Sequence, residues 1–137
     1  MTDSNELFSE VILELYKNPQ NRGKLNVPSL EVSGGNPICG DKATIFLKLE
    51  GNTVVDASFE NVGCAISTAA ASLLTEMVKG KTIIEVLEIT PHQMFDELGG
   101  IIQTRIKCAT LALVLLKEGL RQYQKNPAKT AISGIRV

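Results

Sequence analysis

Three cysteines and one aspartate are the residues of this sequence best suited to chemistry. Cys39 and Asp41 flank Gly40 in a glycine-rich stretch, whereas Cys64 and Cys108 each stand where a helix is predicted to begin. Thiolates bind Zn²⁺ and iron–sulfur clusters, and a carboxylate oxygen can complete a four-coordinate site. A helix N-terminus is expected to lower a thiol pKa and so to favour the thiolate, which also attacks sulfur. We therefore predict one metal- and sulfur-handling site, formed by Cys39, Asp41, Cys64 and Cys108.

The carboxylate of Asp41 indicates how tightly this site would hold its cargo. A site made only of thiolates holds a soft metal or a cluster tightly. A carboxylate at one corner is expected to make the site easier to empty, which suits a protein that passes its cargo on. The contrasting hypothesis is a purely structural zinc domain, but such zinc sites usually have Cys or His at every corner.

The elements that must position these residues follow from hydrophobic periodicity. Apolar and polar residues alternate over 44–50 and again over 53–60, and a Gly-Asn turn joins the two runs. This pattern predicts a β-hairpin. Because a hairpin returns the chain to the end from which it started, Cys39 and Cys64 are expected at the same edge of the sheet.

Helical patterns dominate the rest of the chain. Helices are predicted over 5–17, 64–79 and 105–124, and capping boxes open shorter ones at Thr82 and Thr90. A short strand is predicted over residues 30–33. The fold class expected is α+β, with a small three-stranded antiparallel sheet and helices packed on one face. We expect a single domain over 1–126 and a loose C-terminal tail over 127–137.

Composition argues against several classes of partner. The 137 residues carry a net charge of −1 and only 4% aromatic residues, so neither a phosphate-binding patch nor a base-stacking surface is expected. No apolar run reaches the roughly 18 residues of a membrane span. No signal peptide is recognised, so the cytoplasm is the expected location, where thiols stay reduced. His92, the single histidine, is expected at the surface.

Three stretches resemble the motifs of the NifU/IscU/SufU family. They are Asn-Pro-Ile-Cys-Gly-Asp at 36–41, Gly-Cys-Ala-Ile-Ser at 63–67 and Arg-Ile-Lys-Cys-Ala at 105–109, and a further family stretch is similar to 16–23. The resemblance covers roughly residues 6–119. It implies iron–sulfur cluster assembly on an α+β fold, with a [2Fe–2S] cluster or Zn²⁺ at one end. It also implies a pyridoxal-phosphate-dependent cysteine desulfurase and iron–sulfur acceptor proteins as partners.

The resemblance leaves two functions open. The first is a scaffold that assembles and transfers a [2Fe–2S] cluster, using sulfur from the desulfurase. The alternative is a SufU-type zinc-dependent persulfide carrier that activates the desulfurase, with Cys64 or Cys108 as the persulfide acceptor. A scaffold or carrier is expected rather than an enzyme, although the SufU-type hypothesis would make the protein a sulfurtransferase.

Departures from the family pattern set the chain between its subgroups. IscU-type members have a His before the third cysteine where this chain has Lys107, and residues 100–104 replace their Leu-Pro-Pro-Val-Lys chaperone motif. SufU-type members carry an extra segment between the second and third cysteines, for which the 44 positions from 64 to 108 leave no room. Lys107 and Arg105 are candidates to steer an anionic persulfide or to neutralise the charge of a cluster.

Overall fold

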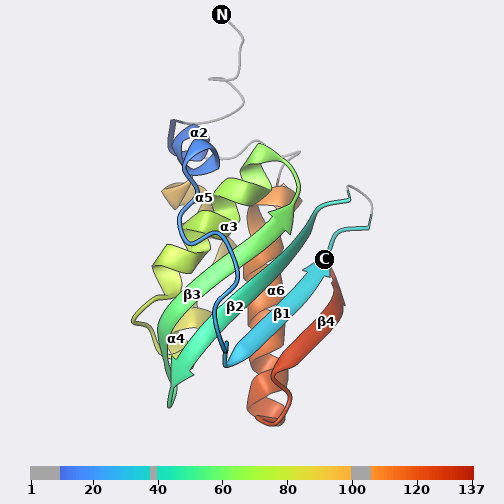
Figure 1. Cartoon of the computed structure of the whole chain (residues 1–137). Helices are drawn as coiled ribbons and strands as arrows, with labels where there is room; N and C mark the ends of the chain where they lie inside the picture. Colours follow the sequence, from blue (N-terminus) through green and yellow to red (C-terminus); the bar gives the residue numbers. More distant parts are fainter. Residues whose placement is uncertain (1–9, 38–39, 100–105) are drawn as a thin grey trace, which may run out of the picture.

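The computed structural model describes residues 10–37, 40–99 and 106–137. Its elements run in the order helix, three strands, four helices and a last strand (Figure 1). Their bounds are α2 Glu10–Lys17, β1 Leu30–Gly35, β2 Lys42–Glu50, β3 Thr53–Val62, α3 Ala65–Val78, α4 Ile83–Leu87, α5 Pro91–Glu97, α6 Ile106–Lys125 and β4 Ala131–Arg136. The predicted first helix is confirmed from residue 10 onward, and its first part, 5–9, lies outside the described residues.

The β-hairpin prediction is confirmed. β2 and β3 pair antiparallel, with Glu50 opposite Thr53 across a two-residue turn. Gly51, the first turn residue, has a φ of +61°, which glycine adopts at little cost. At the other end of the hairpin, Lys42 pairs with Val62. The residues just before β2 and just after β3 therefore meet at one edge of the sheet.

A fourth strand corrects two predictions, the three-stranded antiparallel sheet and the loose tail. The strand order is β3-β2-β1-β4, and β4 runs parallel to β1. Ile132 is only 3% exposed, and the N–H of Val137 donates to the carbonyl oxygen of Gly35 at 3.0 Å. Pairing between strands about a hundred residues apart leaves no local pattern in a six-residue segment, so periodicity did not reveal it.

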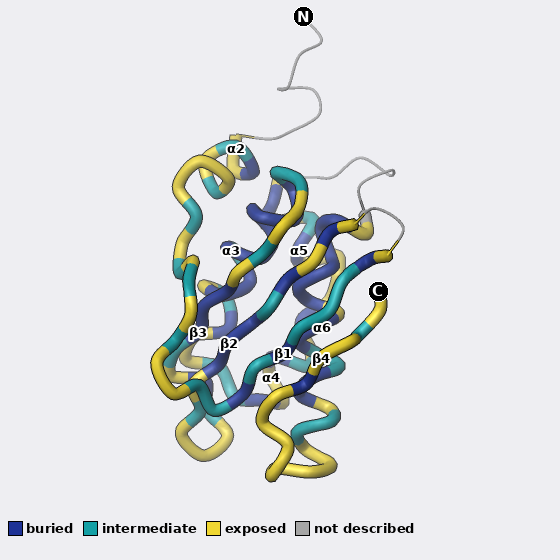
Figure 2. Tube along the Cα trace, turned by 45° about the vertical axis from the view of Figure 1, so that its right-hand side comes forward, coloured by how far each residue is buried: buried dark blue, intermediate teal, exposed yellow. Residues whose placement is uncertain are grey.

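The helices cover one face of the sheet, as predicted. α3 packs on β3, and α6 packs on β1 and β2, while α2 packs on α3 (Figure 1). Buried residues gather between this helical layer and the sheet, and β4 exposes most of its length (Figure 2). The two capping boxes, at Thr82 and Thr90, are present at the starts of α4 and α5. No helix within the described residues has the length and apolarity needed to cross a membrane.

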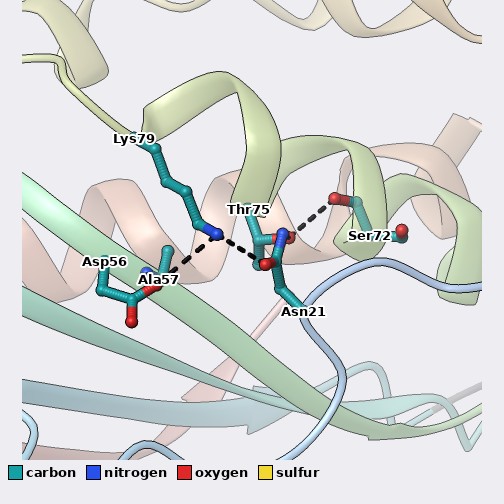
Figure 3. Close-up of polar contacts among 6 residues, drawn as sticks. All are labelled: Asn21, Asp56, Ala57, Ser72, Thr75 and Lys79. Carbon is teal, nitrogen blue, oxygen red and sulfur yellow. Dashed lines mark hydrogen bonds and ion pairs between the residues drawn. The ribbon is translucent and has the colours of Figure 1, made fainter.

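A polar network fixes the chain between α2 and β1 onto α3 and β3 (Figure 3). Asn21, at a φ of +61°, donates through Nδ2 to Thr75 Oγ1 at 3.1 Å. Its Oδ1 accepts from Lys79 Nζ at 2.5 Å, and Lys79 also lies 3.5 Å from Asp56 Oδ1. The backbone oxygen of Asn21 accepts from the N–H of Phe59 at 3.0 Å. One residue therefore links a helix, a strand and a loop.

Substitution of Asn21 by alanine is expected to lower the free energy of unfolding by about 2 kcal/mol, measured by urea denaturation. Roughly half arises because alanine tolerates the left-handed backbone less well than asparagine, and about half because two hydrogen bonds are lost. Asn21→Gly, which keeps the backbone freedom, should cost only about 1 kcal/mol. Equal stability of the alanine variant and the wild type would contradict the structural role of the network.

Candidate metal centre

Asp41 stands at the end of the loop that joins β1 to β2. The loop is closed by two backbone hydrogen bonds, from Asn36 N to Asp41 O and from Gly40 N to Asn36 O, both 2.9 Å. Gly40 has a φ of +80°, a left-handed conformation that explains the glycine beside the aspartate. The aspartate is only 7% exposed, and it belongs to none of the ion pairs formed by the described residues. A buried carboxylate with no cationic partner is costly unless a cation joins it.

Cys64 follows β3 and is the N-cap of α3, as the sequence predicted. Its side chain makes no capping hydrogen bond, so the thiol is free to face the site. Sγ lies 3.7 Å from Asp41 Oδ2, within reach of a weak S–H···O hydrogen bond. Ser67 Oγ donates to the carbonyl oxygen of Cys64 at 3.0 Å, which ties this residue to the first turn of the helix. The hairpin therefore brings Asp41 and Cys64 together.

Cys108 comes from a distant element. It is the third residue of α6, in the first turn as predicted, and it is 8% exposed. Packing of α6 against α3 carries this thiol to the edge of the sheet where the other two groups meet. One ligand atom each from Asp41, Cys64 and Cys108 lies within 4.8 Å of the others.

The donor set fits a single metal ion or the edge of a cluster. Bonds from zinc to oxygen or sulfur are about 2.0–2.3 Å, so tetrahedral ligand atoms are about 3.3–3.8 Å apart. The observed group needs to contract by about 1.5 Å at most to reach that spacing. Two thiolates and a carboxylate also suit the thiophilic metals Zn²⁺ and iron, and disfavour Mg²⁺ and Ca²⁺, which take oxygen ligands.

The protonation of Cys108 differs from the expectation. Burial raises the pKa of the Cys108 thiol to about 12, and its hydrogen bonds and electrostatic interactions with Cys64 and Asp41 act in the same direction. Removal of the thiolate from water is the largest cause of this rise, so the lowering predicted from the helix N-terminus is wrong. A bound divalent cation supplies the missing opposite charge and deprotonates a coordinating thiol.

The remaining predicted residues are placed as follows. Cys39 and Arg105 lie outside the described residues, so their assignment to the site stays a prediction. Lys107 is exposed in the first turn of α6, next to Cys108 in the chain. His92 is at the surface as expected, where its Nε2 lies 3.4 Å from Asp96 Oδ2 and its side chain is 81% exposed.

Two features of the site were not singled out from the sequence. A cavity of about 770 Å³ adjoins Asp41, and Lys42, Glu60 and Arg136 belong to its lining. Arg136 could not be connected with the site because β4 was not predicted. The second feature is Gly63, which precedes Cys64 at the junction of β3 and α3. The sequence feature that could have drawn attention to Gly63 is the Gly-Cys pair at the junction of a predicted strand and a predicted helix.

Comparison with known proteins identifies the family and the fold of this chain. The family model described as the NifU-like N terminal domain matches residues 7–130. A crystal structure of the N-terminal part of a NifU-like protein from Brucella abortus shares the fold, with a TM-score of 0.74. That likeness covers 90% of this chain and 98% of the other, at 21% sequence identity. β4 lies just beyond the residues that the family model matches.

Two sequence relatives carry different functional names. The iron–sulfur cluster assembly scaffold protein IscU 1 of Archaeoglobus fulgidus is 36% identical over 123 residues, which span 90% of this chain and 80% of the relative. The zinc-dependent sulfurtransferase SufU of Bacillus subtilis is 39% identical over 136 aligned positions, with 86% of this chain and 92% of the relative covered. With a family model matched over most of its length and relatives aligned nearly end to end, the chain belongs to the NifU-like N-terminal domain family.

Proposed function

We propose that this protein serves iron–sulfur cluster assembly as a scaffold. It would build a [2Fe–2S] cluster from iron and sulfur and pass it to acceptor proteins. The observation that carries the proposal is the convergence of Asp41, Cys64 and Cys108, whose ligand atoms lie within 4.8 Å of one another. The proposed ligand set is completed by Cys39, two positions before Asp41 in the sequence.

The mixed donor set suits transient cargo. Thiolates bind the irons of the cluster, whereas the carboxylate is a harder and more weakly held ligand for this metal. If the carboxylate dissociates readily, the thiolate of an acceptor protein can bind the iron in its place. The ligand atoms of Asp41, Cys64 and Cys108 already lie within 4.8 Å of one another, so these three groups would need little reorganisation when iron and sulfide arrive.

The second candidate function is a zinc-dependent persulfide carrier. It is favoured by Lys107, where a ligand His would be needed for IscU-type coordination, and by the likeness to the SufU protein. In this mechanism a thiolate of the chain attacks the terminal sulfur of a cysteine persulfide on the desulfurase. A new S–S bond forms on this chain, the S–S bond of the desulfurase breaks, and the desulfurase cysteine leaves as a thiolate.

Cys64 and Cys108 are both proposed as acceptors of that sulfur. Cys64 is half-buried and Cys108 is buried, so Cys64 is the more accessible thiol. The partners proposed are a pyridoxal-phosphate-dependent cysteine desulfurase and iron–sulfur acceptor proteins. The compartment proposed is the cytoplasm, because the site requires reduced thiols. Arg105 and Lys107 are proposed to attract the anionic persulfide or cluster.

The experiment that separates the two functions is chemical analysis of protein purified without oxygen. Iron and acid-labile sulfide in equal amounts, with thiolate-to-iron charge-transfer absorption, are expected for the scaffold. About one zinc per chain, no visible colour and stimulation of a desulfurase are expected for the carrier. Protein that binds neither zinc nor iron after reconstitution would contradict both functions.

A further inference from the structure

We propose that Gly63 is a positioning residue for the metal centre. The missing side chain at this position leaves the space in which the Asp41 carboxylate lies beside Cys64. The inference rests on the metal site of the proposed function, but it does not depend on whether the cargo is a cluster or zinc. Gly63 itself supplies no ligand atom and acts only through Asp41.

The evidence is how closely a methyl group added at position 63 would approach its neighbours. Its carbon would lie 2.4 Å from Ser67 Oγ, 3.0 Å from Asp41 Cγ and 3.1 Å from Asp41 Oδ1. Carbon atoms in ordinary van der Waals contact are about 3.5–4.0 Å apart. Both neighbours would therefore have to move, and one of them is the carboxylate of the site.

Backbone conformation does not explain this glycine. Gly63 is not among the glycines with a positive φ, so alanine would be free of left-handed strain here. Gly40, on the other side of Asp41, has the opposite properties. Its φ is +80°, and a methyl group there would meet no atom of the described residues within 4 Å. Gly40 is thus required by the backbone, whereas Gly63 is required by the side chains around it.

The two oxygens of Asp41 face different neighbours. Oδ2 lies 3.7 Å from Cys64 Sγ, on the side of the ligand group, while Oδ1 is the nearer of the two carboxylate oxygens to position 63. A methyl group at 63 would push on the carbon that carries both oxygens. The aspartate is 7% exposed, so its carboxylate is mostly enclosed by protein atoms. The displacement would therefore change the position of the ligand oxygen.

Ser67 is the second neighbour and can be separated from the first by mutation. Its hydroxyl makes the closest approach to position 63 and donates to the carbonyl oxygen of Cys64. Ser67→Ala removes that hydroxyl but leaves the Asp41 carboxylate in place. The double variant Gly63→Ala/Ser67→Ala therefore removes the closest overlap, with Ser67 Oγ, and keeps the overlap with the Asp41 carboxylate.

The test uses Co²⁺, whose visible absorption reports the number and geometry of its ligands, bound to the full chain in place of the native metal. Gly63→Ala and the double variant with Ser67→Ala are both expected to bind Co²⁺ roughly tenfold more weakly than wild type, the lower end of the range for residues that orient ligands. Their absorption bands should shift toward those of Asp41→Ala. In the Asp41→Ala background, Gly63→Ala should change the affinity by less than about twofold, because the group it displaces is absent.

Gly119→Ala is the matched control. A methyl group there would lie 2.3 Å from Val32 Cγ2, an equally severe overlap, but about 16 Å along α6 from Cys108. This variant should lose thermal stability without metal and keep the wild-type Co²⁺ spectrum. Wild-type affinity and spectrum in Gly63→Ala/Ser67→Ala, or additive effects of Gly63→Ala and Asp41→Ala, would overturn the proposal. Wild-type protein that binds no Co²⁺ would instead overturn the metal site itself.

Discussion

Replacement of Cys108 by alanine is expected to abolish the stabilisation of this protein by zinc. An ion that binds only the folded chain raises its free energy of unfolding by about 4 kcal/mol at a thousand times the dissociation constant. For a chain of this length that corresponds to a rise in the melting temperature of roughly 10–20 °C. The variant loses one of the three candidate ligands that the structure brings together, so the rise should disappear. Scanning calorimetry with and without excess zinc measures it.

The metal-free variant supplies the first control. Loss of one sulfur atom at a site that is 8% exposed should cost only about 1 kcal/mol in the absence of metal. The neighbouring variant Lys107→Ala changes an exposed side chain in the same helical turn and should retain the full zinc effect. A full zinc-induced rise in Cys108→Ala would show that this thiol is not a ligand.

Substitution of Ile132 by alanine is expected to lower the free energy of unfolding by about 2–4 kcal/mol. The side chain is 3% exposed and packs into the core from β4, so its truncation removes apolar contacts and leaves a cavity. Urea denaturation monitored by circular dichroism measures the change. The expected size is a large part of the stability of an ordinary domain, which is about 5–15 kcal/mol.

Ser133→Ala is the matched control for this strand. Ser133 is the next residue and is exposed, so its truncation should change the stability by less than about 0.5 kcal/mol. A large loss of stability at one residue and almost none at the next is expected for a strand with one buried face, because successive side chains point to opposite faces. If both variants were as stable as the wild type, residues 131–136 would not be part of the sheet in solution.

The parts of the fold that could be predicted are those with a local cause. Alternation over 44–60 predicted the hairpin, and Thr82 and Thr90 predicted the starts of α4 and α5, because these signals lie within a few residues of the structure they specify. β4 was missed because its partner, β1, lies about a hundred residues away. Its Gly134, at a φ of +76°, also interrupts the strand pattern.

The candidate site divides in the same way. The hairpin alone predicted that Cys39 and Cys64 share an edge of the sheet. Cys39 lies outside the described residues, but Asp41, two positions further along the chain, lies beside Cys64. The pKa of Cys108 could not be predicted, because its direction depends on burial and on two acidic neighbours supplied by other elements. The role proposed for Gly63 depends on how close atoms of Asp41 and Ser67 lie to the position that a Cβ would occupy. No local sequence pattern predicts such distances between residues of different elements.

The origin of the ligands also bears on the order in which the site comes together. Asp41 and Cys64 are 23 residues apart and are joined by a single hairpin, the kind of local contact that closes within microseconds. Cys108 joins them only when α6 docks on α3 and the sheet, a contact between distant parts of the chain. An incompletely folded chain would thus offer an ion two of these ligands, and the third would arrive with the last helix. A bound metal would then cross-link the β2–β3 hairpin to α6, and it would bind all three of these groups only in fully folded chains.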